Sequence, residues 1–567
     1  MIKRDEIILR NGGEWLHFSE PHRVISTDKI WNVGETLLEI ERLVNENQWH
    51  AAGFVSYEAA PAFDNALHVV ETDGFPLLWF GLYDPPRTVQ LPAPAKDFTE
   101  LKWNPTTERG VYNAAIEKVK DHIASGKTYQ VNYTMRLQAD FSEDTWDFFL
   151  FMAQTQNKYA AYIDTGRHVI CSASPELFFD LDGETLTGRP MKGTVKRGRT
   201  TQEDKELADW LHHSIKNRAE NVMIVDMIRN DFGRIAEIGS VHVPELFTVE
   251  KYPTLLQMTS TVKAKTKASL AELFAALFPC ASITGAPKVS TMNIISELET
   301  TPRKIYTGSI GHIAPNRKAR FNVAIRTALI DREQNKAEYG VGGGIVWDST
   351  SADEYSEALL KAQVLTQRPQ SFSLLETLLW TPEEGYFLLE KHLARVADSA
   401  EFFGFEFSTN KLETHLAQIA SGFTSPQRIR VLVNRSGEIS VEAKDFHPQK
   451  RAFKAQLAEK PMDSHNIFLF HKTTKREMYP SPVLDDILLY NEKDELTEFT
   501  IGNLVVEMDG QLFTPPISCG LLAGTFRAHL LETGKISERI ILKSELPECT
   551  KVFLVNSVRG WVGVEME

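Results

Sequence analysis

A short polar stretch with a central proline, Gln-Arg-Pro-Gln-Ser at 367–371, divides this 567-residue chain. Such a composition is typical of a connection rather than of a helix or strand. A chain of this length also exceeds what a single hydrophobic core organises. We therefore expect a first part at 1–366 with an N-terminal subregion at 1–100, a linker at 367–373, and a second part at 374–567.

The composition is that of a globular protein and excludes several classes of function. Apolar residues make up 42% and charged residues 24% of the chain, which is ordinary for globular domains. The formal net charge of -14 argues against non-specific binding of nucleic acid. Because the four cysteines form no C-x-x-C pair, neither a disulfide framework nor a zinc site is expected. The chain shows no signal peptide and no apolar run of roughly 18 residues, so we expect a cytoplasmic protein.

The most distinctive local feature is the turn Thr-Gly-Arg-Pro-Met-Lys-Gly-Thr at 187–194, which follows a strand-like segment. Proline fixes φ and glycine permits unusual backbone conformations, so we expect Lys192 to be held in a defined geometry. A lysine near other cations can lose its proton and become a nucleophile. From these residues alone, a solvated lysine in a basic turn is the alternative.

A long helical segment is predicted after this turn, from Thr200 to about Val225. Thr200 and Glu203 fit a capping box, and apolar residues then recur at spacings of three and four. The later glycine-rich stretch 339–346 is not a dinucleotide loop, because Ile345 stands where the third glycine of G-x-G-x-x-G should be. No phosphate-binding G-x-x-x-x-G-K-[ST] loop occurs either, which argues against nicotinamide and nucleoside-triphosphate chemistry.

Two glutamates near the end of the first part are candidates for a metal site. Glu354 and Glu357 lie three residues apart on one face of a predicted helix, where two carboxylates can hold a divalent cation. Two other interpretations stay open. Glu354 forms a capping box with Ser351, and Glu357 fits a solvated helix face.

Eight motifs occur in order along the first part, and together they carry a family resemblance. They are Ser-Pro-Glu176, the Pro-x-Lys-Gly-Thr turn, Ala-Glu220-Asn-x-Met-Ile-Val-Asp, Gly-Ala-Pro-Lys288, Tyr306-x-Gly, Ile-Arg326, Gly-Gly-Gly-Ile-Val346 and Glu354-x-x-Glu357-x-x-x-Lys361. In this combination the chain resembles the chorismate-utilising enzymes. Anthranilate and isochorismate synthases of that family carry alanine at the turn, whereas component I of the aminodeoxychorismate synthases carries lysine. The resemblance is therefore to the aminodeoxychorismate synthase branch.

The resemblance implies a role for each of these residues. Lys192 would add covalently to the ring of chorismate, and Glu176 would be the general acid that protonates the departing hydroxyl group. The substrate would be held by Arg326, Tyr306, Lys361 and the backbone of Gly343. Mg²⁺ would be bound by Glu220, Glu354 and Glu357. Because no glutamine amidotransferase domain can be seen in the chain, a separate glutaminase subunit is expected to supply ammonia.

The second part resembles the fold-type IV pyridoxal-phosphate enzymes, and among these aminodeoxychorismate lyase, which releases pyruvate and leaves 4-aminobenzoate. Lys472 directly follows the strand-like segment 467–471 and would be the lysine that carries the cofactor, with Lys475 as the rival. Glu498 would bind the pyridine nitrogen. The phosphate would be bound by Arg395, Gly524 and Thr525.

The two resemblances imply an α/β (mixed α+β) protein, with a large chorismate-binding β-sandwich and helices followed by a fold-type IV domain. The expected function is bifunctional synthesis of 4-aminobenzoate for folate. The second part lacks the short N-terminal strand of free-standing relatives, so a non-catalytic docking module or a transaminase-like half is an alternative. Anthranilate synthase component I is the alternative for the first part. Since fold-type IV enzymes are usually dimers, a homodimer also stays open.

Overall fold

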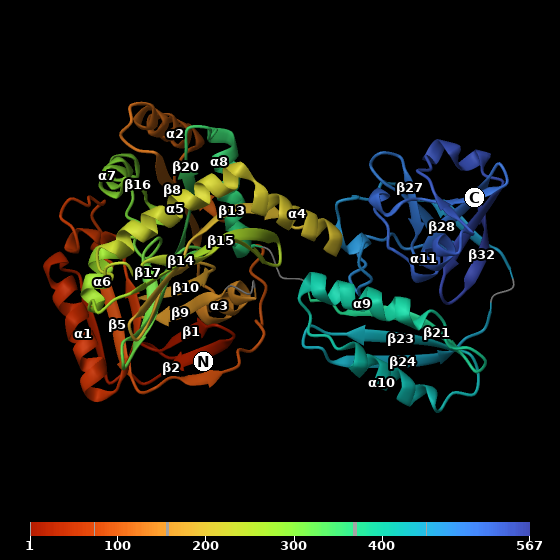
Figure 1. Ribbon diagram of the computed structural model, residues 1–567, viewed down its shortest axis with the longest axis horizontal. Helices are drawn as coiled ribbons and strands as arrows, with labels where there is room; N and C mark the ends of the chain where they lie inside the picture. The colour runs from red at the N-terminus through yellow and green to blue at the C-terminus, as the bar shows by residue number, and fades with distance from the viewer. Residues whose placement is uncertain (1, 73, 155–157, 367–370, 449–450) are drawn as a thin grey trace. The chain divides into compact units, whose positions relative to one another are not determined.

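The structure, a computed structural model, describes residues 2–72, 74–154, 158–366, 371–448 and 451–567 (Figure 1). The chain forms two compact units, each built from two stretches of sequence. The first unit is Met1–Val195 with Trp210–Pro369, and the second is Lys196–Asp209 with Gln370–Glu567. The linker predicted at 367–373 falls partly outside the described residues, which omit 367–370.

Two sheets of ten strands each form the centre of the first unit. The first sheet has the order β16-β8-β20-β19-β10-β9-β1-β2-β6, and β7 also pairs with β8. Its strands are β1 (Ile7–Asn11), β2 (Glu14–Phe18), β6 (Arg87–Val89), β7 (Asn104–Pro105), β8 (Gln130–Asp140), β9 (Tyr159–Asp164), β10 (His168–Ser174), β16 (Gly285–Ala286), β19 (Thr327–Asp331) and β20 (Lys336–Ile345).

The second sheet has the order β13-β15-β12-β11-β18-β17-β4-β5-β3, and β14 also pairs with β15. Its strands are β3 (Arg23–Thr27), β4 (His50–Val55), β5 (Leu78–Tyr83), β11 (Leu177–Asp182), β12 (Thr185–Arg189), β13 (Met191–Lys196), β14 (His242–Lys251), β15 (Leu255–Lys265), β17 (Ser309–Ala314) and β18 (Lys318–Val323). Lys192 lies on β13, at one end of this order.

A shared core between the two sheets confirms the predicted β-sandwich. One cluster of buried side chains combines residues of the first sheet with residues of the second; among them are Ile7, Ile163, Leu329, Phe54 and Ile310. Because both inner faces are apolar, the sheets must pack against each other to remove this surface from water.

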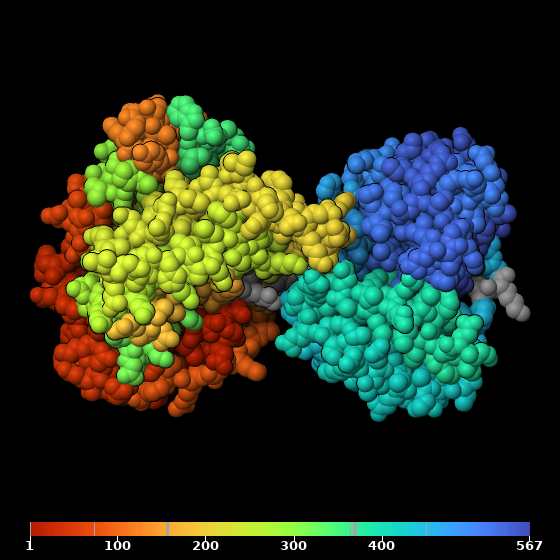
Figure 2. Space-filling model, in the orientation of Figure 1, coloured from red at the N-terminus to blue at the C-terminus, as the bar shows by residue number. Residues whose placement is uncertain are grey.

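Seven helices described in the first unit cover the outer faces of the sandwich (Figure 1). They are α1 (Val33–Asn47), α2 (Arg109–Ala124), α3 (Thr145–Ala153), α5 (Ile215–Gly233), α6 (Leu270–Leu277), α7 (Lys288–Leu298) and α8 (Ser351–Lys361). Leu37 of α1, Ile224 of α5 and Phe274 of α6 share one buried cluster with Phe321 of β18. On the face drawn in Figure 2, the yellow atoms of α5 form part of the molecular surface.

The long helical segment predicted from Thr200 is two helices, α4 (Thr201–His213) and α5, with a break at Ser214. The side chain of Ser214 accepts a hydrogen bond from the backbone N–H of Asn217 and so begins a new helix. Serine competes with helix continuation through such local bonds. The apolar residues predicted at spacings of three and four do not all lie on a buried face, because Ile215 is 87% exposed. α4 begins in the second unit and ends in the first.

A four-stranded sheet and two helices form one layer pair of the second unit. The sheet has the order β22-β21-β23-β24. Its elements are β21 (Leu374–Thr381), β22 (Gly385–Tyr386), β23 (Gln427–Val433) and β24 (Ile439–Asp445), with α9 (Leu389–Phe403) and α10 (Thr409–Ala420). Leu393 of α9 and Leu416 of α10 pack with Ile429 of β23 in one buried cluster.

The other sheet of the second unit has eight strands in the order β27-β26-β25-β32-β31-β28-β29-β30. Since β27 also pairs with β28, six of these strands close into a ring. The elements are β25 (Phe453–Leu457), β26 (Asp486–Tyr490), β27 (Leu496–Phe499), β28 (Gly502–Met508), β29 (Gln511–Thr514), β30 (Ser537–Glu538), β31 (Lys551–Asn556), β32 (Gly560–Met566) and α11 (Thr525–Glu532).

Among the residues that the structure describes, no helix is long and apolar enough to cross a membrane.

Candidate active sites

The backbone and the side chain of Lys192 are both placed by α5. Nζ of Lys192 lies 3.8 Å from Oε2 of Glu220. The next residue, Asn221, donates from Nδ2 to the backbone oxygen of Lys192 at 3.3 Å. Gly193 has φ +99°, which disfavours any residue with a side chain at that position. The defined geometry expected for Lys192 is therefore built from a glycine turn and one helix.

Glu176 has the properties of a general acid at neutral pH. It is buried between β10 and β11, and burial raises its pKa to about 7, although a hydrogen bond from Ser282 and the charges of Lys192 and Arg326 act in the opposite direction. Oγ of Ser282 donates to Oε1 of Glu176 at 2.7 Å. A carboxyl group with this pKa is still protonated in a large fraction of molecules near pH 7.

The glycines of β20 bring α8 to the lysine. A Cβ atom at Gly344 would lie 3.4 Å from Nζ of Lys192, and one at Gly343 would lie 2.9 Å from Oε2 of Glu354. Lys361 donates to the backbone oxygen of Gly342 at 2.8 Å. Because glycines have no side chain, a ligand can approach the backbone of β20 closely here. The structure thus brings together Lys192, Gly343, Glu354 and Lys361.

The three glutamates predicted to bind Mg²⁺ surround the same two lysines, but each has another partner. Oε1 of Glu357 lies 2.9 Å from Nζ of Lys361, and Glu354 accepts a 2.6 Å hydrogen bond from Ser349. Glu220 pairs with Lys192. Within the described part of the chain, no three His, Cys, Asp or Glu side chains are grouped closely enough to hold a metal ion. The carboxylate donors suit a hard cation, but the predicted ligand set is not assembled here.

Electrostatics around the two α8 glutamates differ in sign. Burial and the charge of Glu357 raise the pKa of Glu354. The charge of Lys361 lowers the pKa of Glu357, although burial opposes it. Glu357 is therefore the more fully ionised of the two, and it is the better candidate for a carboxylate that binds a cation.

Tyr306 and Arg326 lie beside the β20 glycines and Glu176, respectively. Tyr306 is buried, and a Cβ atom at Gly340 would collide with its ring, at 2.1 Å. The guanidinium carbon of Arg136 lies over the same ring, 5.2 Å from its centroid. Arg326 has φ +51°, in the left-handed region, between β18 and β19. Non-glycine residues in this region often mark functional sites.

Sequence reasoning missed Gln130 at the start of β8. Gln130 is 1% exposed, yet neither its Oε1 nor its Nε2 has a hydrogen-bond partner. A Cβ atom at Gly344 would lie 2.6 Å from its Nε2, so the amide is next to Lys192. A buried amide without partners is costly unless a ligand supplies them. The available signal was a polar side chain in a strand that is otherwise almost entirely buried.

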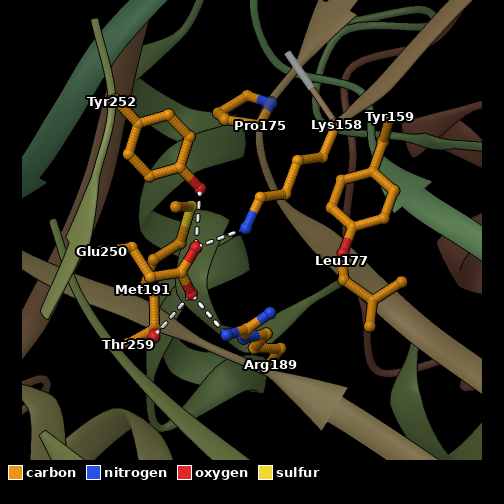
Figure 3. Close-up of a pocket in the computed structure, with 9 residues that line it drawn as sticks. All are labelled: Lys158, Tyr159, Pro175, Leu177, Arg189, Met191, Glu250, Tyr252 and Thr259. Carbon is orange, nitrogen blue, oxygen red and sulfur yellow. Dashed lines mark hydrogen bonds and ion pairs between the residues drawn. The ribbon is translucent and has the colours of Figure 1, made fainter. Parts of the chain in front are cut away.

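A charged cluster lies beside the segments that carry Glu176 and Lys192 (Figure 3). Pro175 and Leu177, on either side of Glu176, and Met191, next to Lys192, line a small pocket. Glu250 in this pocket receives ion pairs or hydrogen bonds from Lys158, Arg189 and Thr259 at 2.5, 2.6 and 2.8 Å. Strand residues alternate between two faces, so Lys192, which follows Met191 on β13, points away from this cluster.

In the second unit, Lys472 has the environment expected for a lysine that carries a carbonyl cofactor. Burial, together with the charge of Arg395, lowers its pKa to about 8. Its charge also interacts with that of Glu498, which is buried and whose pKa burial raises to about 8. The rival Lys475 instead places Nζ 5.0 Å from the centroid of the Phe468 ring. The geometry favours Lys472.

Glu498 is held on both carboxylate oxygens. The hydroxyl group of Tyr479 donates to Oε1 at 3.1 Å, and Nδ2 of Asn503 donates to Oε2 at 3.3 Å. A Cβ atom at Gly524 would lie 1.8 Å from Oδ1 of Asn503, so this position requires glycine. Gly524 is the residue that precedes α11. The predicted pyridine and phosphate ligands are therefore neighbours.

Arg395 reaches the same helix N-terminus, but its guanidinium is shared with a carboxylate that sequence reasoning missed. Nε and Nη2 of Arg395 donate to Glu376 at 2.8 and 2.7 Å, and Nη1 donates to the backbone oxygen of Ala523 at 3.3 Å. His392 also binds Glu376, at 2.7 Å, and lies 3.3 Å from Oγ1 of Thr525. Burial alone would raise the pKa of Glu376, but Arg395 and His392 hold it well below its ordinary value.

These residues fit pyridoxal phosphate. Lys472 offers an amine with a lowered pKa to an aldehyde, and Glu498 offers a buried carboxyl group to a ring nitrogen. Arg395 and the N-terminus of α11 offer charge and N–H groups to a phosphate. The anchoring carboxylate Glu376 fixes the orientation of Arg395 without lying in any recognisable motif.

Comparison with known proteins agrees with this geometry. A family described as chorismate binding enzyme matches residues 13–367, and a family described as amino-transferase class IV matches residues 373–566. The chain belongs to the chorismate-binding enzymes. The region that matches this family is followed by a fold-type IV domain, and that fold implies pyridoxal phosphate.

Individual relatives match the first part. The chain is 41% identical over 276 residues to aminodeoxychorismate synthase component 1 of Bacillus subtilis, covering 48% of this chain and 58% of that protein. It is 40% identical over 273 residues to the protein of the same name from Escherichia coli, covering 47% and 60%. The chain thus spans somewhat over half the length of these relatives. Anthranilate synthase component I of Streptococcus pneumoniae shares the fold, with a TM-score of 0.56, 24% identity and coverage of 65% and 93%.

Proposed function

We propose that this protein makes 4-aminobenzoate from chorismate in two steps, amination of chorismate and then elimination of pyruvate. The observation that carries the proposal is that Lys192 lies close enough to the buried Glu176 for its charge to act on that carboxyl group, whose pKa burial raises to about 7. Two relatives that are 41% and 40% identical in sequence bear the name aminodeoxychorismate synthase component 1. The fold-type IV domain that follows supplies a place for the second step.

In the first step, the amine of Lys192 attacks C2 of chorismate, both conjugated ring double bonds shift by one position, and the bond from C4 to its hydroxyl oxygen breaks. Glu176 donates the proton with which this hydroxyl group leaves as water. Ammonia then adds at C4, both ring double bonds shift back, and the C2–lysine bond breaks. Glu176 recovers a proton from the added nitrogen. Covalent catalysis divides one difficult displacement into two easier ones.

Chorismate is a dianion, and this acidic protein must neutralise it locally. Lys361 and Arg326 supply positive charge, and the β20 glycines let the substrate approach the backbone. Glu220, Glu354 and Glu357 would hold Mg²⁺, which when bound neutralises a substrate carboxylate. Holding the ion would require Glu220 and Glu357 to exchange their ion pairs with Lys192 and Lys361 for the metal, and Glu354 to turn from Ser349 toward it.

Ammonia would come from a separate glutaminase subunit. The relatives are named as component 1, which supports a second component. In this chain, burial raises the pKa of all four cysteine thiols, Cys171, Cys280, Cys519 and Cys549. None is therefore prepared to be the thiolate nucleophile that a cysteine-dependent glutaminase needs.

In the second step, pyridoxal phosphate supplies an electron sink for breaking a bond to hydrogen and eliminating pyruvate. Lys472 would bind the cofactor and would then move a proton at the reacting carbon. Glu498 would hold the ring nitrogen, and Arg395 with Thr525 would hold the phosphate. The lyase assignment over a transaminase rests on the fusion, because joined domains often perform consecutive steps.

The test is the product formed from chorismate, Mg²⁺ and ammonium by the purified protein. We expect 4-aminobenzoate to accumulate without a second enzyme. Aminodeoxychorismate alone would restrict the proposal to the first step and leave the second unit as a docking module. Anthranilate would contradict the assignment of Lys192.

A further inference from the structure

The second unit contains residues from the middle of the sequence. Its contacts unite Lys196–Asp209 with Gln370–Glu567, although the former stretch lies within the region that matches the chorismate-binding family. This stretch, here called the inserted segment, follows the strand that carries Lys192 and includes the first turns of α4.

A buried ion pair anchors the inserted segment. The Arg197 side chain is 8% exposed and that of Asp204 is 0% exposed, and they pair through hydrogen bonds of 2.5 to 2.9 Å. Arg197 also donates to the backbone oxygen of Phe402 at 2.8 Å and lies 4.4 Å from the centroid of its ring. Asp204 in turn accepts from the backbone N–H of Gly198 at 2.8 Å. Breaking a buried pair leaves an uncompensated charge, so this anchor is strongly held.

A second anchor ends at the residue beside the cofactor lysine. Nε2 of His471 lies 3.1 Å from the backbone oxygen of Arg199, and Nδ1 lies 3.0 Å from Oγ of Ser399. Because a carbonyl oxygen only accepts, Nε2 carries the hydrogen and Nδ1 accepts from the serine. His471 is 3% exposed and stacks on the ring of Phe402, with centroids 4.3 Å apart.

The orientation of His471 is thus defined on both ring nitrogens and on one ring face. Burial lowers the pKa of His471 to about 4, despite the opposing bond to Arg199, so the ring stays neutral and keeps this single arrangement. The next residue is Lys472, whose backbone oxygen accepts from the N–H of Leu375 at 2.9 Å. The backbone at 471–472 is therefore fixed from β21 on one side and from the inserted segment on the other.

We propose that the inserted segment is an integral part of the pyridoxal-phosphate unit and that Arg199, through its bond to His471, positions Lys472. The cofactor unit is then not formed by the C-terminal sequence alone. This inference uses the assignment of Lys472 as the cofactor lysine, which belongs to the function proposed above. Arg199 and His471 are positioning residues, because neither is placed against the reacting atoms.

The test compares variants of the full chain. His471→Phe keeps an aromatic ring but loses both hydrogen bonds, and Asp204→Asn weakens the buried pair. His471→Gln keeps an N–H donor that can reach Arg199. Lys205→Ala, at an exposed position of α4, is the matched control. The readouts are the pyridoxal-phosphate dissociation constant, the visible circular dichroism of the bound cofactor, and hydrogen exchange of the backbone amides at 198–204.

We expect His471→Phe and Asp204→Asn to weaken cofactor binding by about fivefold to a hundredfold, as the loss of a buried hydrogen bond predicts. The visible dichroism should change in both, His471→Gln should recover much of the binding, and amide exchange should rise at 198–204. Lys205→Ala should match the parent protein. Continued chorismate consumption shows that each variant is folded.

Parent-like binding, dichroism and amide exchange in both variants would overturn the inference. If instead Lys472 is not the cofactor lysine, the result looks different. The Lys472→Ala variant would then keep the visible absorbance of bound pyridoxal phosphate. In that case the amide exchange still decides whether the inserted segment is part of the unit. Slow exchange at 198–204 supports its integral packing, and fast exchange refutes it.

Discussion

Asn221 holds the backbone of Lys192 while its neighbour holds the side chain. The Nδ2 atom of Asn221 donates to the Lys192 oxygen at 3.3 Å, and Glu220 lies 3.8 Å from Nζ. Asn221 is itself 0% exposed and accepts from Ser260 at 2.6 Å. One turn of α5 therefore contacts Lys192 both at its backbone and at its side-chain nitrogen. The proposed nucleophile needs such a fixed position.

Replacing Lys192 by alanine should abolish the covalent route. We expect formation of aminodeoxychorismate to fall by about a thousandfold or more, as the loss of a nucleophile does in other enzymes. The Kd for chorismate should change little, because other cations hold its carboxylates. Steady-state kinetics and equilibrium binding measure the two quantities, with Lys196→Ala, exposed on the same strand, as control. An unchanged rate would remove Lys192 from the mechanism.

The amination rate should depend on pH through Glu176. Burial raises its pKa from 4.5 to about 7, and the general acid must be protonated, so the rate should fall as pH rises through about 7. Glu176→Gln should reduce the rate by about a hundredfold to ten-thousandfold and remove this inflection. The inflection persisting in Glu176→Gln would assign it to another group.

The same raised pKa affects stability, with a defined sign. Between 4.5 and about 7 the folded protein binds a proton at Glu176 that the unfolded chain releases. The free energy of unfolding should therefore fall as pH rises through this window, and less so in Glu176→Gln. Urea unfolding at several pH values measures the difference.

Glu357→Gln should weaken the binding of the Mg²⁺ on which amination depends. The charge of Lys361 keeps the pKa of Glu357 low, so the parent side chain is an anion and the amide is a much poorer ligand for a hard cation. A titration of activity with Mg²⁺ should shift to higher concentration. Asp353→Asn, exposed on the same helix, is the control. An unaltered titration would count against the ligand role.

Alanine substitutions should show which of the two candidate lysines, Lys472 or Lys475, binds the cofactor. The visible absorbance of bound pyridoxal phosphate should disappear in Lys472→Ala, because the lowered pKa and the neighbouring Glu498 belong to that lysine. It should remain in Lys475→Ala. The reverse result would move the cofactor to Lys475.

Local motifs allowed much of this arrangement to be predicted. The Lys192 turn, Glu176 and the α8 glutamates are marked by short patterns whose residue types follow from the chemistry. The β-sandwich and the fold-type IV domain are what the two family resemblances carried by such patterns imply. The structure confirms both folds and brings Lys192, Glu176, Gly343 and Glu354 to one region.

What could not be predicted depends on contacts between distant residues. Gln130 and Glu376 carry no motif. The interest of Gln130 follows from its position beside Gly344, and that of Glu376 from its hydrogen bonds to Arg395. Ser214 looks like any serine in a helical pattern until its side chain caps α5. The sequence predicts a helix from Thr200 within the inserted segment, but no pattern connects Arg199 with the histidine that it contacts 272 positions further along the chain.

The most direct test of the central claim is the mass of the intact protein after it has met chorismate and Mg²⁺ without ammonia. The account predicts an adduct with the mass of chorismate less one water, located at Lys192 by peptide sequencing and absent from Lys192→Ala. Ammonium should discharge it into aminodeoxychorismate. An unmodified protein that nevertheless aminates chorismate at the full rate would contradict the covalent mechanism.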